Sequence, residues 1–118
     1  MQNNRKIGSR YEELAAAYYR SLGCRIVQQN FRCPLGEIDL IVRDGEYLVF
    51  AEVKYRFDDA FGRGQFHVDK RKQSKIIRTA EWYLMQLGRE DLPCRFDVIA
   101  IDGEGRIEHI KNAFSKAF

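Results

Sequence analysis

At 118 residues the chain has the length of a single domain, and a domain of this size buries roughly two-thirds of the surface that its unfolded chain exposes. Its hydrophobic content of 45% and net charge of +3 are ordinary for a globular protein, so only the distribution of charge is informative. No apolar run approaches the ~20 residues of a membrane span, and the N-terminal segment lacks the apolar core of a signal peptide. Three widely spaced cysteines without a Cys-x-x-Cys pair argue against a disulfide framework or a zinc site, and they favour the cytoplasm.

The N-terminal part of the chain predicts a flexible tail over residues 1–7 and then a helix. Ser9 and Glu12 have the spacing of a capping box, and Gly23 is of the residue type that commonly follows the end of a helix. The apolar stripe of this helix comprises Tyr11, Leu14, Ala15, Tyr18 and Leu22. Glu12 has two interpretations. The first is a structural capping acid; the second is a carboxylate that leans over the sheet, because Glu12 shares a side of the helix with Ala16.

Residues 36–56 predict a β-hairpin around which the rest of the chain is organised. The dipeptide Asp44-Gly45 separates two apolar runs, which is a strong hairpin signal because a type I′ turn needs positive φ at both central positions. We therefore predict antiparallel strands over residues 37–43 and 46–55. The turn would fix the register of the two strands, and with it the face on which each side chain lies.

The predicted register separates the two faces of the hairpin. One face is apolar and comprises Ile38, Leu40, Val42, Tyr47, Val49, Ala51, Val53 and Tyr55. On the other face, Asp39 lies opposite Phe50 and is a diagonal neighbour of Glu52, about 7–8 Å away at the backbone. Glu37 and Lys54 share that face. Carboxylates gathered in this way repel one another unless a cation offsets their charge.

Asp39 and Glu52 are therefore candidate ligands for Mg²⁺, which prefers one or two carboxylates together with water and substrate phosphate. Lys54 lies on the same side, where it would hold an attacking water or meet charge that develops on a phosphate. The alternative is a solvated, salt-bridged rim of Glu37, Glu52 and Lys54, because an Asp followed at this distance by Glu-x-Lys is common by chance. The register supports the metal site, since it brings all four groups to one face without adjustment.

The remaining segments predict an α/β fold. They are a strand over residues 24–30, a turn over 31–35, a loop over 57–66, a helix over 70–87 with Asp69 as its cap and Gly88 at its end, a strand over 94–102 and a short strand over 107–111. A crossover helix between two strands implies a right-handed parallel connection, so we expect a mixed central sheet with an α-β-β-β-α-β core, a short C-terminal strand and flanking helices. Asp97 interrupts an apolar strand, and we interpret it as a structural acid paired with Arg95 or Lys111 rather than a helper of the site.

The second predicted helix carries a basic stripe. Arg71, Lys75, Arg78 and Trp82 follow one another at helical spacing, and Lys72 lies at the edge of the stripe. The helix macrodipole disfavours cations in the first turns, so this placement suggests an outside anion such as a phosphate backbone. Trp82 would then either stack on a base or lie half-buried against a neighbour. The alternative for the whole stripe is a solvated basic face.

Together, these motifs resemble the YraN-like (UPF0102) bacterial family of uncharacterised proteins. The combination of Gly-Glu-Ile-Asp-Leu at residues 36–40 with Phe-x-Glu-Val-Lys-x-Arg at residues 50–56 is highly specific, and the likeness runs from about Gly8 to Phe114. Further matching residues are Glu12, Ala15, Gly23, Asn30, Phe61, Gly62, Lys72, Ala80, Arg95, Phe96, Asp97, Asn112 and Ala113. That family in turn resembles the PD-(D/E)xK nucleases of the restriction-endonuclease-like fold, and among them the archaeal Holliday-junction resolvases.

The resemblance implies a role for each candidate residue. Asp39 and Glu52 would be metal ligands, Lys54 the catalytic lysine and Glu12 the acid of the first helix, which would join them as a third ligand and catalytic group. The candidate nucleic-acid contacts are Arg56, Arg71, Lys72, Lys75 and Arg78. Resolvase-like proteins act as dimers, because paired cuts need two sites, so the resemblance also implies a homodimer.

The leading hypothesis is a nuclease that uses Mg²⁺ or Mn²⁺ to hydrolyse phosphodiester bonds in DNA. Few residues are placed to read bases, so recognition of a structure such as branched DNA fits better than recognition of a sequence. One alternative is a nucleic-acid-binding module of the same fold that does not cut, and another is a protein-interaction adaptor whose acids form a solvated rim. The Asp39, Glu52 and Lys54 set discriminates between them, because a pure binder does not need it.

Overall fold

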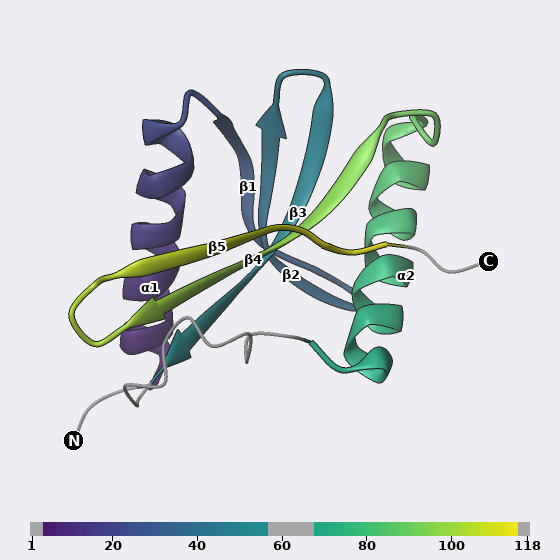
Figure 1. The fold of residues 1–118 in the computed structure, drawn as a ribbon. Coiled ribbons are helices and arrows are strands. Elements are labelled where there is room, and N and C mark those ends of the chain that lie inside the picture. The colour runs from purple at the N-terminus through teal and green to yellow at the C-terminus, as the bar shows by residue number, and fades with distance from the viewer. Residues whose placement is uncertain (1–3, 57–67, 116–118) are drawn as a thin grey trace.

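The computed structural model describes residues 4–56 and 68–115, with side chains from residue 10 onward. A five-stranded mixed sheet lies between two helices, α1 (Asn4–Ser21) on one face and α2 (Lys70–Leu87) on the other (Figure 1). This architecture confirms the predicted α/β class and is consistent with a restriction-endonuclease-like fold. The predicted loop over residues 57–66 and the first three residues of the predicted tail lie outside the described residues.

The strands follow one another across the sheet in chain order. They are β1 (Arg25–Cys33), β2 (Gly36–Asp44), β3 (Tyr47–Arg56), β4 (Cys94–Asp102) and β5 (Ile107–Phe114). Strands β3 and β4, which α2 connects, run parallel, and every other pair is antiparallel. Strand β5 continues three residues beyond its predicted end, because Phe114 pairs with Phe96 and the two rings stack 5.1 Å apart.

Helix α1 differs from its prediction in both start and orientation. It begins at Asn4, so Ser9 lies inside the helix and the capping-box interpretation of Glu12 is wrong. The side chains of α1 that are fully buried are Ala15, Ala16 and Tyr19. Leu14 and Leu22 of the predicted stripe are 38% and 54% exposed, respectively. The two alanines allow the helix to lie close to the sheet, and Glu12 falls on the same side, as its second interpretation requires.

The hairpin between β2 and β3 turns one residue later than predicted, which moves the pairing partner of each strand residue by two. Asp44 pairs with Tyr47, so the central residues are Gly45 and Glu46. Gly45 has a φ of 60°, whereas Glu46 is not among the described non-glycine residues with positive φ. This is the pattern expected of a type II′ turn, which needs glycine only at its first central position. Because the register moves by an even number of residues, nearly all side chains keep their predicted faces.

Helix α2 agrees with the prediction at both ends. The carboxylate of Asp69 accepts a hydrogen bond from the backbone N–H of Lys72 at 2.8 Å, and Gly88 closes the helix in the left-handed conformation with a φ of 69°. Trp82 is half-buried, 6.0 Å from the ring of Phe31, which confirms the second of its two interpretations. Within the described part of the chain, neither helix is long and apolar enough to cross a membrane.

Candidate metal centre

The site is built where strand β2 changes faces. Leu40 belongs to the core beneath α1, whereas Ile38 belongs to the core beneath α2, so the predicted placement of Ile38 on the face of Leu40 is wrong. On the neighbouring strand β1, Asn30 has a φ of 55°, a left-handed conformation that interrupts the regular alternation. Asn30 lies between the residues of β1 that pair with Ile38 and Leu40 of β2. The side chains of both strands therefore change direction at the same level of the sheet.

The rotation turns Asp39 toward β3. The described pairing of β2 with β3 ends at Leu40 and Ala51, and beyond it Oδ2 of Asp39 accepts a hydrogen bond from the backbone N–H of Val53 at 2.8 Å. The carboxylate of Asp39 thus accepts the hydrogen bond that a backbone carbonyl of β2 would accept if the regular pairing continued. The predicted position of Asp39 opposite Phe50 is wrong, because Phe50 pairs with Ile41. The observed register, continued by one residue, brings Asp39 opposite Glu52.

Asp39 is a half-buried acid whose negative neighbours outweigh the positive charge near it. Burial raises its pKa to about 7, and the neighbouring charges of Glu52 and Glu12 contribute to the increase. The hydrogen bond from Val53 and the positive charge of Lys72 oppose the shift without cancelling it. The pair Asp39–Glu52 therefore lies in the fold at an electrostatic disadvantage that additional positive charge would relieve.

Glu52 is buried and forms an ion pair with the second helix. Its Oε1 lies 2.7 Å from Nζ of Lys72, and its side chain is 11% exposed. Burial lowers the pKa of Lys72, but the hydrogen bond and charge of Glu52, with the charges of Asp39 and Glu37, raise it overall. An anion for the basic first turn of α2 is thus supplied within the protein, by the carboxylate of Glu52. Lys72 contacts the site itself, and is more than the edge of an outward stripe.

Glu12 brings a third carboxylate from α1. Its side chain is half-buried and hydrogen-bonded to the side chain of Asn30. Burial raises the pKa of Glu12, the hydrogen bond to Asn30 lowers it, and the charges of Glu37 and Glu52 raise it. The structure therefore brings Glu12, Asp39 and Glu52 within electrostatic reach of one another, as the second interpretation of Glu12 anticipated.

The remaining predicted carboxylate and the catalytic lysine lie at the margin of this cluster. Glu37 is 64% exposed and pairs with Arg32 at 3.3 Å, so it belongs to the rim. Lys54 follows Phe50 and Glu52 at alternate positions of β3 and is half-buried. None of the ion pairs among the described residues involves Lys54.

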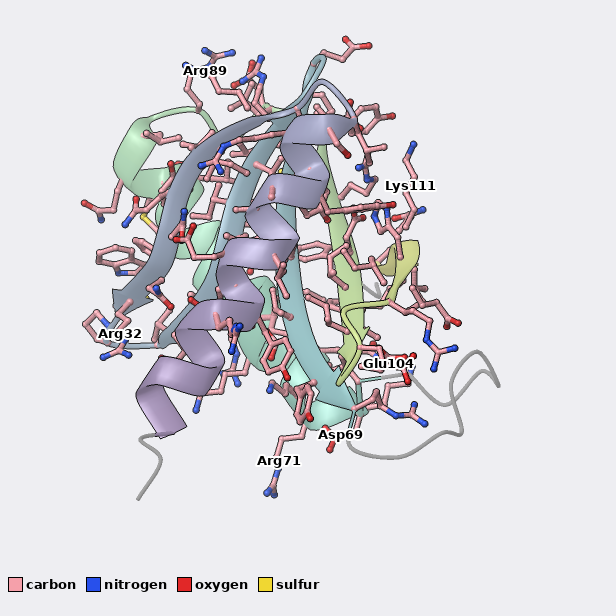
Figure 2. All side chains as sticks on the ribbon, turned by 90° about the vertical axis from the view of Figure 1, so that its left-hand side faces the viewer. Arg32, Asp69, Arg71, Arg89, Glu104 and Lys111 are labelled. Carbon is pink, nitrogen blue, oxygen red and sulfur yellow. The ribbon has the colours of Figure 1, made fainter. Side chains whose placement is uncertain are left out.

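Helix α2 begins, and β3 ends, toward the same end of the molecule (Figure 1), so Arg56 and Arg71 lie at that end, and Lys75 and Arg78 follow along the helix. Arg71, Lys75 and Arg78 are exposed, and Arg56 is half-buried at the end of β3. Figure 2 shows Arg71 projecting at this end, near Asp69 and at the opposite end of the molecule from Arg89.

Gly36 explains how the turn between β1 and β2 lies so close to α2. A Cβ at this position would lie 2.8 Å from Oγ1 of Thr79 and 3.3 Å from Cε of Lys75, so no larger residue fits without a shift. The glycine that begins the Gly-Glu-Ile-Asp-Leu motif thus anchors β2 against α2, three residues before Asp39.

Asp97 forms a separate cluster on the opposite face of the sheet. It is fully buried beneath α1. Its partners are Tyr19 Oη at 2.8 Å, Arg95 Nε at 3.0 Å, His109 Nε2 at 2.7 Å and the backbone N–H of Asn112 at 2.9 Å. Burial alone would raise its pKa, but the hydrogen bonds lower it well below the usual range. The predicted pairing with Arg95 is confirmed, and Lys111 is not a partner in the described part of the chain.

The sequence matches a known family over most of its length. The family model described as Uncharacterised protein family UPF0102 matches residues 11–101, a range that contains every residue of the carboxylate cluster. The chain belongs to this family. A UPF0102 protein of Geobacter sulfurreducens is 46% identical and covers 98% of this chain and 94% of its own length. UPF0102 proteins of Thermodesulfovibrio yellowstonii and Vibrio campbellii are 45% and 44% identical, and cover 92% and 97% of this chain.

The donor set of this UPF0102 chain fits a hard divalent cation. Asp39 and Glu52 offer two carboxylates, and Mg²⁺ commonly takes one or two such ligands and completes its shell with water and phosphate. Within the described ranges, no three His, Cys, Asp or Glu side chains gather closely enough to hold an ion by themselves. Two carboxylates alone would not complete the coordination shell of such an ion, so water or substrate oxygen atoms would have to supply the remaining ligands.

Two residues of importance escaped the reasoning from motifs. Asn30 was noted only as part of the family likeness, although asparagine is among the few residues that readily adopt the left-handed conformation and so mark a turn in a strand. His109 lies outside any ligand spacing, yet it bonds both Asp97 and Tyr18. No local pattern identifies His109, because its partners are 12 and 91 residues away in the chain.

Proposed function

We propose that this UPF0102 protein is a nuclease that uses Mg²⁺ or Mn²⁺ to hydrolyse phosphodiester bonds in DNA. The observation that carries the proposal is the pair of half-buried Asp39 and buried Glu52, in which desolvation and repulsion raise the pKa of Asp39 to about 7. A solvated rim would leave both groups exposed, and a pure binding module has no need for repelling acids beneath its surface. The family description itself assigns no activity.

The chemistry would divide among four side chains. A bound divalent ion would polarise the phosphodiester and lower the pKa of a water molecule. Asp39 and Glu52 would hold that ion, and Glu12 would add a third carboxylate from α1. Lys54, on the same face as Glu52, would orient or deprotonate the attacking water and balance charge on the pentavalent phosphate.

The nucleic acid would lie across the end where α2 begins. Arg71, Lys75 and Arg78 are exposed there, and Arg56 ends the strand that carries Glu52. Contacts of this kind bind the phosphate backbone and carry no sequence information, so we propose selectivity for a DNA structure such as a branch. Paired cuts in a branch need two sites, which makes a homodimer the expected working form, and access to bacterial DNA makes the cytoplasm its expected location.

The decisive variant is Asp39→Asn. Asparagine keeps an oxygen that can accept the hydrogen bond from Val53, so the protein should remain folded while the site loses one anionic ligand. We expect cleavage of branched DNA in Mg²⁺ or Mn²⁺ to fall by at least about a hundredfold, as is typical when one essential group of a catalytic set is removed. Cleavage of branched, duplex and single-stranded DNA on denaturing gels measures the effect.

Glu37→Gln is the matched control for Asp39→Asn. It removes the same charge from an exposed position two residues away, and it should leave cleavage unchanged. Equal loss in both variants would indicate a general effect of charge on DNA binding. No metal-dependent cleavage by the unmodified protein on any of the three substrates would contradict the proposal.

A second candidate function is a nucleic-acid-binding module that does not cut. It is favoured by the ion pair of Lys72 with Glu52, which already gives that carboxylate a cation. This alternative expects binding that weakens steeply with salt, as phosphate contacts require, and that Asp39→Asn leaves intact. Binding measured at two salt concentrations, beside the cleavage assay, separates the two functions.

A further inference from the structure

We propose that Lys72 is an internal counter-ion, which occupies the cation position of the Asp39–Glu52 pair and leaves it when a divalent ion binds. The inference rests on the proposed function and deepens it, since it assigns to this side chain the control of metal entry.

The first support is the geometry of the ion pair. Nζ of Lys72 lies 2.7 Å from Oε1 of Glu52, a carboxylate whose side chain is only 11% exposed. A divalent ion needs the same oxygen atoms, and two cations in contact with one carboxylate repel each other. Ion binding at Glu52 and the present position of Lys72 therefore exclude each other, at least in part.

The second support is the field around the ammonium group. The charges of Glu52, Asp39 and Glu37 all stabilise protonated Lys72 against its burial. The converse holds for Asp39, whose carboxylate is stabilised by Lys72. Lys72 thus serves the pair as a whole, as an ion bound between the carboxylates would.

The third support is that Lys72 is free to move. Its side chain is 49% exposed, so about half of its surface already contacts solvent. The start of α2 does not depend on that side chain, because Asp69 caps the helix through the backbone N–H of Lys72. The ammonium group can leave Glu52 without unwinding the helix.

A consequence follows for DNA binding. Once displaced, Lys72 would present its charge beside Arg71 and Lys75, at the end of the molecule proposed to hold the phosphate backbone. Capture of Lys72 by a phosphate would favour metal binding, and metal binding would favour capture by the same factor, because coupling between two sites is reciprocal. Lys72 would then neutralise the carboxylates of Asp39 and Glu52 until the nucleic acid and the ion are both present.

The test is a titration of the full-length protein with Mn²⁺ alone, followed by electron paramagnetic resonance of the free ion. Lys72→Gln keeps a hydrogen-bond donor for Glu52 but removes the competing charge, and Lys72→Met removes both. We expect both variants to bind Mn²⁺ at least about tenfold more tightly than the unmodified protein. Lys75→Gln, which removes the same charge one turn further along α2, should bind within about twofold of it.

The outcomes separate this inference from the function on which it rests. If the unmodified protein binds Mn²⁺, Asp39→Asn abolishes binding, and the Lys72 variants bind no more tightly, the counter-ion inference is overturned while the metal site stands. If Asp39→Asn binds Mn²⁺ as the unmodified protein does, both proposals are overturned. Circular dichroism identifies a variant that fails to fold, and the other Lys72 variant then decides the result.

A second arm tests the coupling with a short duplex DNA at a concentration that saturates the protein. In the unmodified protein the duplex should tighten Mn²⁺ binding, because phosphate holds Lys72 away from Glu52. In Lys72→Gln the duplex should tighten it markedly less. Equal tightening in the two proteins would overturn the coupling, and with it the exchange of Lys72 between Glu52 and phosphate.

Discussion

Two aspartates, the fully buried Asp97 and the half-buried Asp39, are in opposite electrostatic states. Asp97 receives hydrogen bonds from three side chains and one backbone N–H, and its pKa lies well below the usual range. Asp39 receives one backbone hydrogen bond and has Glu52 beside it, and its pKa is raised to about 7. Burial by itself raises the pKa of both. The number of donors and the sign of the nearest charge therefore decide the outcome.

The comparison separates a structural acid from a candidate functional one. The partners of Asp97 come from α1, β4 and β5, so its carboxylate joins elements that are distant in sequence. Asp39 and Glu52 instead retain repulsion that the fold does not remove, which is typical of sites that receive a charged ligand. Variants of the two clusters should therefore differ in stability and in the way that stability depends on pH.

Asp97→Ala should cause the largest loss of stability. It removes the carboxylate of His109 and one of the two carboxylates that pair with buried Arg95, the other being Asp44, so the free energy of unfolding should fall by about 3 kcal/mol. Tyr19→Phe removes a single hydrogen bond to the same carboxylate and should lower it by about 1 kcal/mol. Urea denaturation at pH 7 measures both. Equal losses in the two variants would contradict the central position of the Asp97 carboxylate among these hydrogen bonds.

The pH dependence of stability should distinguish the two aspartates. The folded-state pKa of Asp39, about 7, exceeds its unfolded value of about 4, so the folded protein binds more protons and stability falls as pH rises between these values. In metal-free buffer, Asp39→Asn should therefore be more stable than the unmodified protein by up to about 4 kcal/mol at pH 8 and nearly equal to it at pH 4. The stabilisation from Asp97, whose pKa is lowered, is lost only at acidic pH. An unchanged difference between pH 4 and pH 8 would contradict this assignment.

Asn30 allows a smaller test of the strand rotation that orients Asp39. At a φ of 55°, Asn30→Ala should lower the free energy of unfolding by about 1 kcal/mol more than Asn30→Gly, since both lose the bond to Glu12 but only alanine strains the backbone. Thermal and urea unfolding of the two variants give the difference. Equal stabilities would mean that the strand keeps its course without a left-handed residue.

The exposed pair of Arg32 and Glu37 should contribute least. Both side chains are more than half exposed, so Glu37→Gln should change the free energy of unfolding by less than about 0.5 kcal/mol. The same variant serves as the control for cleavage. A larger loss in urea would show that Glu37 belongs to the buried cluster rather than its rim.

The sequence by itself determined the features that depend on neighbouring residues. Both ends of α2 were predictable because Asp69 and Gly88 act within one helical turn. The approach of Asp39 to Glu52 was also predictable, because a two-residue turn joins their strands and a shift by two residues preserves side-chain faces. The acids of the candidate site therefore followed from the motif, although the roles proposed for them stay predictions.

The tertiary structure alone decided which of these groups are compensated. The rotation of α1 depends on how its alanines pack on the sheet, and it brings Glu12 toward the site rather than into a cap. Lys72 meets Glu52, and His109 meets Asp97, only because crossover and sheet order bring distant segments together. A carboxylate's pKa depends on burial and on every charge nearby, and these are properties of the packed molecule that no local pattern contains.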